Sequence, residues 1–163
     1  MIQKKRVLII DDDPAVLGVV KAMLDDNNYE GITAPTPQEG LEKARHLGPD
    51  IILLDLLLPD ISGLGVLREM KRDPQLASIP VVVFTGLGDD IIAGEARDLG
   101  AVGLLTKNCS MNELISMMDR ISVYRETELK RTPSSFATRE GRPTKFLWLN
   151  TPLVKPKPPT RLP

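Results

Sequence analysis

Near its amino end the chain reads Val7-Leu-Ile-Ile-Asp-Asp-Asp-Pro14, four apolar residues followed by three aspartates and a proline. The apolar run does not alternate with polar residues, which is typical of a strand buried on both faces of a sheet. Asp13 before Pro14 is typical of a helix N-cap and the first helical residue. The stretch therefore predicts a buried strand that ends at acidic residues and leads directly into a helix.

The same order of apolar run and helical segment repeats along the chain. The predicted strands cover residues 7–10, 29–34, 51–55, 80–85 and 102–106. The predicted helices cover residues 14–27, 37–47, 63–72, 89–99 and 111–124 or slightly beyond. Capping-box patterns, Thr36 with Glu39 and Ser110 with Glu113, mark the starts of two of these helices. Alternating strands and helices predict an α/β fold, an open parallel sheet with helices on both faces.

Charge and proline divide the chain into two parts. Residues 1–124 carry a balance of -7, whereas residues 125–163 carry +6 and half of the 14 prolines. We therefore expect a folded domain over 1–124 and a basic, Pro-rich, disordered tail over 125–163. Proline breaks helix interiors, so we expect no dedicated DNA-binding domain in this tail.

Composition excludes several classes of protein. The net charge of -1 argues against a strongly basic nucleic-acid binder. A single cysteine and a single histidine exclude a disulfide framework and a Cys/His zinc site. No apolar stretch approaches the ~20 residues of a membrane span, and the run 7–10 is too short for a signal peptide. We expect a cytoplasmic protein without membrane contact.

Polar residues stand where the predicted strands end. Asp11 and Asp12 follow the first strand, and Asp55 ends the third. In a doubly wound sheet of order 2-1-3-4-5, the site lies between these two strands, at their carboxyl ends. Thr85 and Lys107, at the ends of the fourth and fifth strands, are expected beside the three carboxylates.

Carboxylates placed together need a compensating cation. Two unit charges ~5 Å apart at an effective dielectric of ~20 repel by about 3 kcal/mol. Lys107 can supply one positive charge, and Mg²⁺, which prefers oxygen ligands, can supply more. A carboxylate can also act as a nucleophile and form an aspartyl-phosphate, and Asp55 is the candidate.

Four segments together resemble the receiver domain of response regulators. They are Val7–Pro14, Asp50–Gly63, Pro80–Gly86 and Gly100–Lys107. The resemblance covers about residues 5–124, in the order and spacing of the family, and it implies a flavodoxin-like (βα)5 fold.

The resemblance also implies a set of roles. Asp55 would accept a phosphoryl group from a sensor histidine kinase or a phosphotransfer protein. Thr85 would sense that group, and Lys107 would contact it. The implied ligands of Mg²⁺ are Asp11, Asp12, Asp55 and the backbone carbonyl of Leu57.

Three departures from the family pattern stand out. Asn108 replaces the proline that usually follows the lysine in a cis peptide, so we expect a trans bond here because a non-proline cis bond costs ~3–4 kcal/mol. Leu104 replaces the aromatic switch residue, which excludes a ring flip coupled to Thr85. Leu57 and Leu87, each two residues after a key position, are apolar and predict slow autodephosphorylation.

These features predict a stand-alone receiver, a phospho-switch of a two-component system or phosphorelay. It would catalyse only its own phosphorylation and slow dephosphorylation, with no other enzyme activity. Output would pass to a downstream protein partner through the face formed by helix 89–99, strand 102–106 and helix 111–124. The alternatives are a phosphorylation-independent pseudo-receiver that uses the basic tail, and a nucleic-acid binder acting through that tail.

Overall fold

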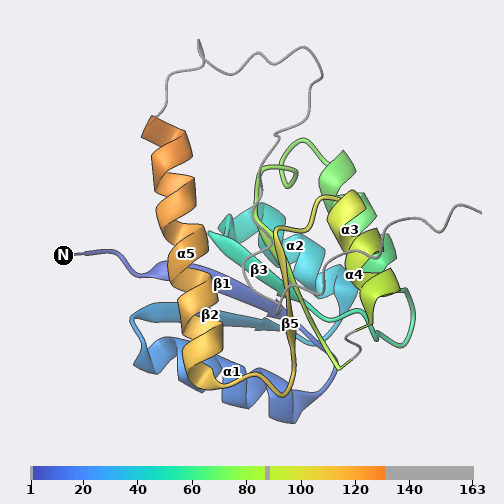
Figure 1. Ribbon diagram of the computed structural model, residues 1–163, viewed down its shortest axis with the longest axis horizontal. Coiled ribbons are helices and arrows are strands. Elements are labelled where there is room, and N and C mark those ends of the chain that lie inside the picture. Colours follow the sequence, from blue (N-terminus) through green and yellow to red (C-terminus); the bar gives the residue numbers. More distant parts are fainter. Residues whose placement is uncertain (1, 87–88, 131–163) are drawn as a thin grey trace, which may run out of the picture.

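A computed structural model describes residues 2–86 and 89–130, with side chains described as far as Glu126. It contains five strands and five helices in strict alternation (Figure 1). The strands are β1 (Lys5–Ile10), β2 (Tyr29–Ala34), β3 (Ile51–Leu54), β4 (Val81–Thr85) and β5 (Gly103–Thr106). The helices are α1 (Pro14–Asp26), α2 (Pro37–Leu47), α3 (Gly63–Arg72), α4 (Asp90–Asp98) and α5 (Met111–Lys130).

The strands form one parallel sheet in the order β2-β1-β3-β4-β5. Helices α1 and α5 cover one face, and α2, α3 and α4 cover the other (Figure 1). The flavodoxin-like fold expected from the sequence is therefore confirmed.

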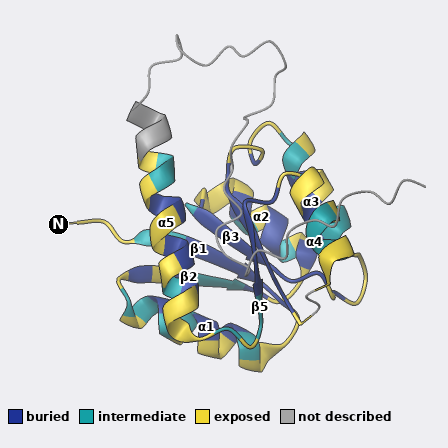
Figure 2. Ribbon diagram, viewed as in Figure 1, coloured by how far each residue is buried: buried dark blue, intermediate teal, exposed yellow. Residues whose placement is uncertain are grey.

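The unbroken apolar runs reflect burial on both faces of the sheet. Val7 and Ile9 belong to the apolar cluster under α1 and α5, whereas Leu8 and Ile10 belong to the cluster under α2, α3 and α4. Successive side chains of a strand point to opposite faces, so a strand covered on both sides must be apolar at every position. Figure 2 shows this buried sheet between helices whose outer surfaces are exposed.

Most element boundaries lie within one residue of those predicted, and two lie further out. Strand β1 begins at Lys5, because the backbone of residues 5 and 6 pairs with that of β2 whatever side chains they carry. Helix α5 continues to Lys130, past the predicted domain end at 124. The rest of the predicted tail lies outside the described residues.

The predicted helix starts are confirmed by their hydrogen bonds. The Asp13 carboxylate accepts from Ala15 N at 2.9 Å. Ser110 and Glu113 form a reciprocal capping box, with Glu113 Oε2 accepting from Ser110 N at 2.7 Å and Ser110 Oγ accepting from Glu113 N at 3.2 Å. None of the helices in the described part of the chain has both the length and the apolar character to cross a bilayer.

Candidate functional site

Three carboxylates meet at the carboxyl ends of β1 and β3. Asp11 and Asp55 are only 1% and 2% exposed, and Asp12 is exposed beside them. One carboxylate oxygen from each of the three lies within 4.8 Å of the other two. The adjacency predicted from the strand order is therefore present in the structure.

The sheet itself places the two buried acids. Asp55 N donates to Ile10 O at 3.0 Å and Asp11 N donates to Ala34 O at 3.2 Å, so both residues continue the parallel hydrogen-bond ladder by one step. Their side chains are then held by local amides. Asp11 Oδ1 accepts from Asp13 N at 2.9 Å, and Asp55 Oδ1 accepts from Leu57 N at 3.1 Å.

Gly63 has a structural role that the sequence interpretation did not assign. A Cβ atom at this position would lie 2.3 Å from the backbone oxygen of Asp55 and 2.5 Å from Cα of Leu56. Only glycine lets the start of α3 approach the strand end so closely. A glycine at the first helical residue after the loop that follows Asp55 is the sequence signal that could have indicated this close approach.

Lys107 joins the two buried carboxylates from the end of β5. Its Nζ lies 2.6 Å from Asp11 Oδ2 and 2.9 Å from Asp55 Oδ2. Its backbone N donates to Thr85 O at 3.0 Å, which fixes the lysine to the neighbouring strand. The lysine therefore lies in the same site as the acids, as the sequence predicted.

The loop after Lys107 differs from the proline turn of the family. The described residues contain no cis peptide bond, so the expected trans geometry at Asn108 is confirmed. Cys109 N donates to Thr106 O at 3.0 Å, and the Thr106 hydroxyl donates to Asn108 Oδ1 at 2.5 Å. A tight turn braced by two side chains therefore carries the lysine.

Burial and pairing set the ionisation of this group. Burial raises the pKa of the Asp11 carboxyl above its ordinary value, against the lowering effects of Lys107 and of the Asp13 amide. Burial acts to lower the pKa of Lys107, but its contacts with Asp11 and Asp55 outweigh burial and raise that pKa. The lysine is therefore held in its charged form between the two acids.

The donor set fits a hard divalent cation. Three carboxylates carry more negative charge than Lys107 neutralises, and their oxygens are the ligands that Mg²⁺ prefers. Oδ2 of Asp11 is buried, and the Lys107 ammonium group lies 2.6 Å away as its ion-pair partner. The exposed Asp12 leaves the acidic pocket open to solvent.

The remaining described positions that the sequence predicted lie in β4, in β5 and in the loop after Asp55. Thr85 is fully buried at the end of β4, and Leu57 is 55% exposed in the loop after Asp55. Leu104 is 3% exposed and belongs to the apolar cluster that includes Ala96 of α4, so no aromatic ring occupies the switch position. Leu87 lies outside the described residues.

Comparison with known proteins assigns the family. A family model described as "Response regulator receiver domain" matches residues 7–119. The chain belongs to this family. Receiver domains are signalling modules rather than conventional enzymes, and the acidic pocket of Asp11, Asp12 and Asp55 is the kind of pocket in which they bind Mg²⁺.

Curated relatives of this receiver domain include transcriptional regulators. The "DNA-binding dual master transcriptional regulator RpaA" of a Synechocystis strain is 38% identical over 111 residues, which cover 68% of this chain and 46% of the relative. The "Transcriptional regulatory protein KdpE" of Mycobacterium tuberculosis is 36% identical over 121 residues, which cover 74% of this chain and 52% of the relative. The chain thus spans about half the length of the curated relatives it matches.

Solved structures agree with the family assignment. A CheY-like receiver domain protein from Methanospirillum hungatei is 27% identical, with a TM-score of 0.72 and coverage of 77% of this chain and 99% of that one. The chemotaxis protein CheY4 of Vibrio cholerae is 26% identical, with a TM-score of 0.69 and coverage of 73% and 99%.

These relatives correct one expectation from the sequence. We expected a downstream protein partner acting through the α4–β5–α5 face and no dedicated DNA-binding domain. That expectation is wrong, because the matched relatives are regulators of transcription and one is named as DNA-binding. The error came from judging the output by the composition of residues 125–163 alone.

Proposed function

We propose that this protein is a cytoplasmic, phospho-accepting response regulator of a two-component system or phosphorelay, and that Asp55 is its phosphoacceptor. The observation that carries this proposal is the buried Asp55 carboxylate, 2.9 Å from Lys107 Nζ and clustered with Asp11 and Asp12. A nucleophilic carboxylate, an ammonium group and a cation site together provide what phosphoryl transfer requires.

The reaction begins at one carboxylate oxygen of Asp55. This oxygen attacks the phosphorus of a phosphohistidine on a sensor kinase or a phosphotransfer protein, forming an O–P bond while the P–N bond breaks. The imidazole leaves with the bonding electron pair and takes up a proton. Asp11, Asp12, Asp55 and the Leu57 carbonyl would hold Mg²⁺, which neutralises charge on the phosphoryl oxygens when it is bound.

Lys107 and Thr85 would act on the phosphoryl group once Asp55 carries it. In the unmodified protein Lys107 offsets the charge of the two buried carboxylates. Once Asp55 is modified, the ammonium group contacts a phosphoryl oxygen instead, and the Thr85 hydroxyl donates to another. Repositioning these two residues at the ends of β4 and β5 changes what the protein binds.

We propose that the output of this switch is control of transcription. The support is that relatives which match this chain over the receiver domain are named as transcriptional regulators. The alternative of a phosphorylation-independent interaction module is not favoured, because an acceptor, a second and third carboxylate, a threonine and a lysine all occupy the positions that phosphorylation needs.

Intact-protein mass spectrometry tests the proposal. The full chain is incubated with acetyl phosphate or phosphoramidate, which carries a P–N bond, with and without Mg²⁺. We expect one phosphoryl group that requires Mg²⁺, is absent from Asp55→Asn and is retained in the control Asp60→Asn, an exposed aspartate of the same loop. Absence of a phosphoryl group on the wild type with both donors would refute the proposal.

A further inference from the structure

Helix α5 continues beyond both the family match and the apolar core. The family model ends at residue 119, whereas the helix ends at Lys130. Ile121 is the last buried apolar side chain of the helix among the described residues, and Val123 is 64% exposed. The described side chains of α5 after Ile121 are therefore not part of the buried apolar core.

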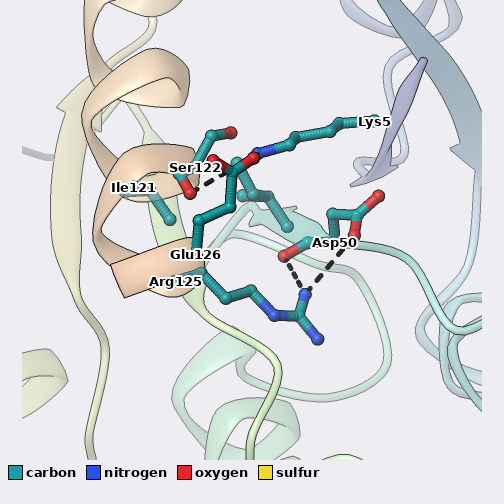
Figure 3. A pocket seen from close by; sticks show the side chains of 7 residues that line it. Lys5, Asp50, Ile121, Ser122, Arg125 and Glu126 are labelled. Carbon is teal, nitrogen blue, oxygen red and sulfur yellow. Dashed lines mark hydrogen bonds and ion pairs between the residues drawn. The ribbon is translucent and has the colours of Figure 1, made fainter. Parts of the chain in front are cut away.

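Two charged side chains tie this part of the helix to the sheet instead. Arg125 Nη1 donates to the backbone oxygen of Asp50 at 2.7 Å and lies 3.7 Å from its carboxylate (Figure 3). Glu126 Oε1 lies 2.5 Å from Lys5 Nζ, which also donates to Ser122 O at 3.4 Å. Lys5 precedes the family match and Arg125 and Glu126 follow it, so this contact lies outside the matched region.

The charged contacts surround a cavity rather than a close-packed interface. A cavity of about 130 Å³ lies between α5 and the amino ends of β1 and β3. Ile51 and Ile121 contribute its apolar walls, and Ser122 and the charged side chains of the previous paragraph line the rest (Figure 3). Ion pairs and hydrogen bonds across this cavity thus connect the helix to the sheet.

This contact lies at the end of the sheet opposite the candidate site. Lys5 begins β1 and Asp11 follows its last residue, while Asp50 precedes β3 and Asp55 follows it. Helix α5 begins just after the Lys107 loop and reaches the opposite end with its last turns (Figure 1). The helix thus links the phosphoryl-transfer end of the domain to the end where the described chain stops.

We propose that Lys5, Asp50, Arg125 and Glu126 form an electrostatic clasp that reversibly docks the final turns of α5 on the sheet. Partly exposed ion pairs are individually weak and are screened by salt, so the docked and released forms lie close in free energy. When the clasp closes, it fixes the direction in which the chain leaves the domain. When it opens, the last turns of α5 separate from the sheet. The inference does not depend on phosphorylation of Asp55.

Amide hydrogen exchange on the full chain tests the clasp. We expect the amides of residues 122–130 to exchange about twofold to fivefold faster in Glu126→Gln and in Arg125→Gln than in the wild type, and faster in the wild type at high salt. The exchange rates of the buried amides of β4 should stay unchanged in these variants. The control Asp90→Asn, which changes an exposed acid of α4, should leave the exchange of residues 122–130 unchanged.

A charge swap separates the effect of the ion pair on exchange from the effect of the intrinsic stability of the helix. Lys5→Glu and Glu126→Lys each place like charges together and accelerate exchange, and the double variant restores the wild-type rate. The double-mutant cycle cancels the effect of each substitution on its own element. Equal exchange in the wild type and the single variants, or no restoration in the double variant, would overturn the proposal.

Discussion

Nζ of Lys107 lies 2.9 Å from Oδ2 of Asp55, although the two residues are 52 positions apart in the chain. The same nitrogen lies 2.6 Å from Asp11 Oδ2. One ammonium group thus balances two carboxylates that are almost fully removed from water. Both the stability of the site and its chemistry depend on this arrangement, and each can be measured.

Removal of the Lys107 ammonium group should lower both the stability of the protein and the rate of its phosphorylation. We expect Lys107→Met to lower the free energy of unfolding by about 2–4 kcal/mol, because two buried carboxylates lose their counter-charge. The rate of phosphorylation by acetyl phosphate should fall at least about tenfold. Urea unfolding and mass spectrometry measure the two effects. Arg45→Met, which removes surface ion pairs with Glu69 and Asp73, is the control and should change stability by less than about 1 kcal/mol.

Mg²⁺ should stabilise the unmodified protein. A cation that binds only the folded state adds about 2.7 kcal/mol at a hundredfold excess over its Kd, because binding removes folded protein from the unfolding equilibrium. Thermal unfolding with Mg²⁺ and with a chelator measures this gain. It should be smaller in Asp12→Asn and intact in Asp60→Asn. An equal gain in both variants would show that Mg²⁺ binds elsewhere.

The braced turn after β5 should support phosphorylation through Lys107. Thr106→Val removes the hydroxyl that donates to Asn108 Oδ1 at 2.5 Å. We expect the maximal phosphorylation rate to fall about threefold to tenfold, because small displacements of a catalytic group are costly. Thr106→Ser, which keeps the hydroxyl, should recover the wild-type rate. If Thr106→Val reacts at the wild-type rate, the turn needs no such support.

Leu57 should slow hydrolysis of the phosphorylated form. Its side chain is 55% exposed next to Asp55 and hinders water that approaches the phosphoryl group. We expect Leu57→Asn to accelerate autodephosphorylation about tenfold. Ile61→Asn, 40% exposed in the same loop, is the matched control and should leave the rate unchanged. Loss of the phosphoryl group from purified protein over time gives both rates.

Lys71 should make the protein more stable at alkaline pH. Its Nζ donates to the backbone oxygens of Ala77 and Ile79, at 3.2 and 3.0 Å, and burial lowers its pKa to about 8. Between this value and the ordinary 10.5 the unfolded chain binds more protons, so stability rises with pH.

Comparison with Lys71→Met isolates this effect. Between about pH 7 and about pH 10, the free energy of unfolding of the wild type should rise by about 1–3 kcal/mol relative to that of Lys71→Met. This range includes a reduction for solvent screening at the partly exposed end of the side chain. Urea unfolding at several pH values measures the difference. A difference between the two proteins that does not change with pH would contradict the expected pKa.

The sequence predicted the fold and the neighbourhood of the site well, for a specific reason. A strand covered on both faces must be apolar at every residue, so its last apolar residue marks its end within about one position. Asp11 and Asp55 directly follow such runs, and the order of a doubly wound sheet brings those ends together. The positions of Thr85 and Lys107 followed by the same argument.

The sequence could not predict contacts between distant charges. Lys5 and Glu126 are 121 positions apart, and neither carries a local pattern that identifies the other as its partner. The predicted start of β1 was too late because backbone pairing with β2 does not depend on the side chains of residues 5 and 6, and the predicted end of α5 was too early. The sequence also could not predict that Lys71 is half-buried, because a lysine near the end of a helix is ordinarily solvated.

The sequence by itself determined the five strand-helix units, the acidic residues at two strand ends and the lysine at a third, because periodicity and local signals encode these features. Tertiary structure alone decided that Lys107 bridges Asp11 and Asp55, that Gly63 allows α3 to approach the end of β3, and that Lys5 and Asp50 form ion pairs with the last described residues of α5. Distances between side chains depend on how whole elements pack, and a linear pattern does not contain them.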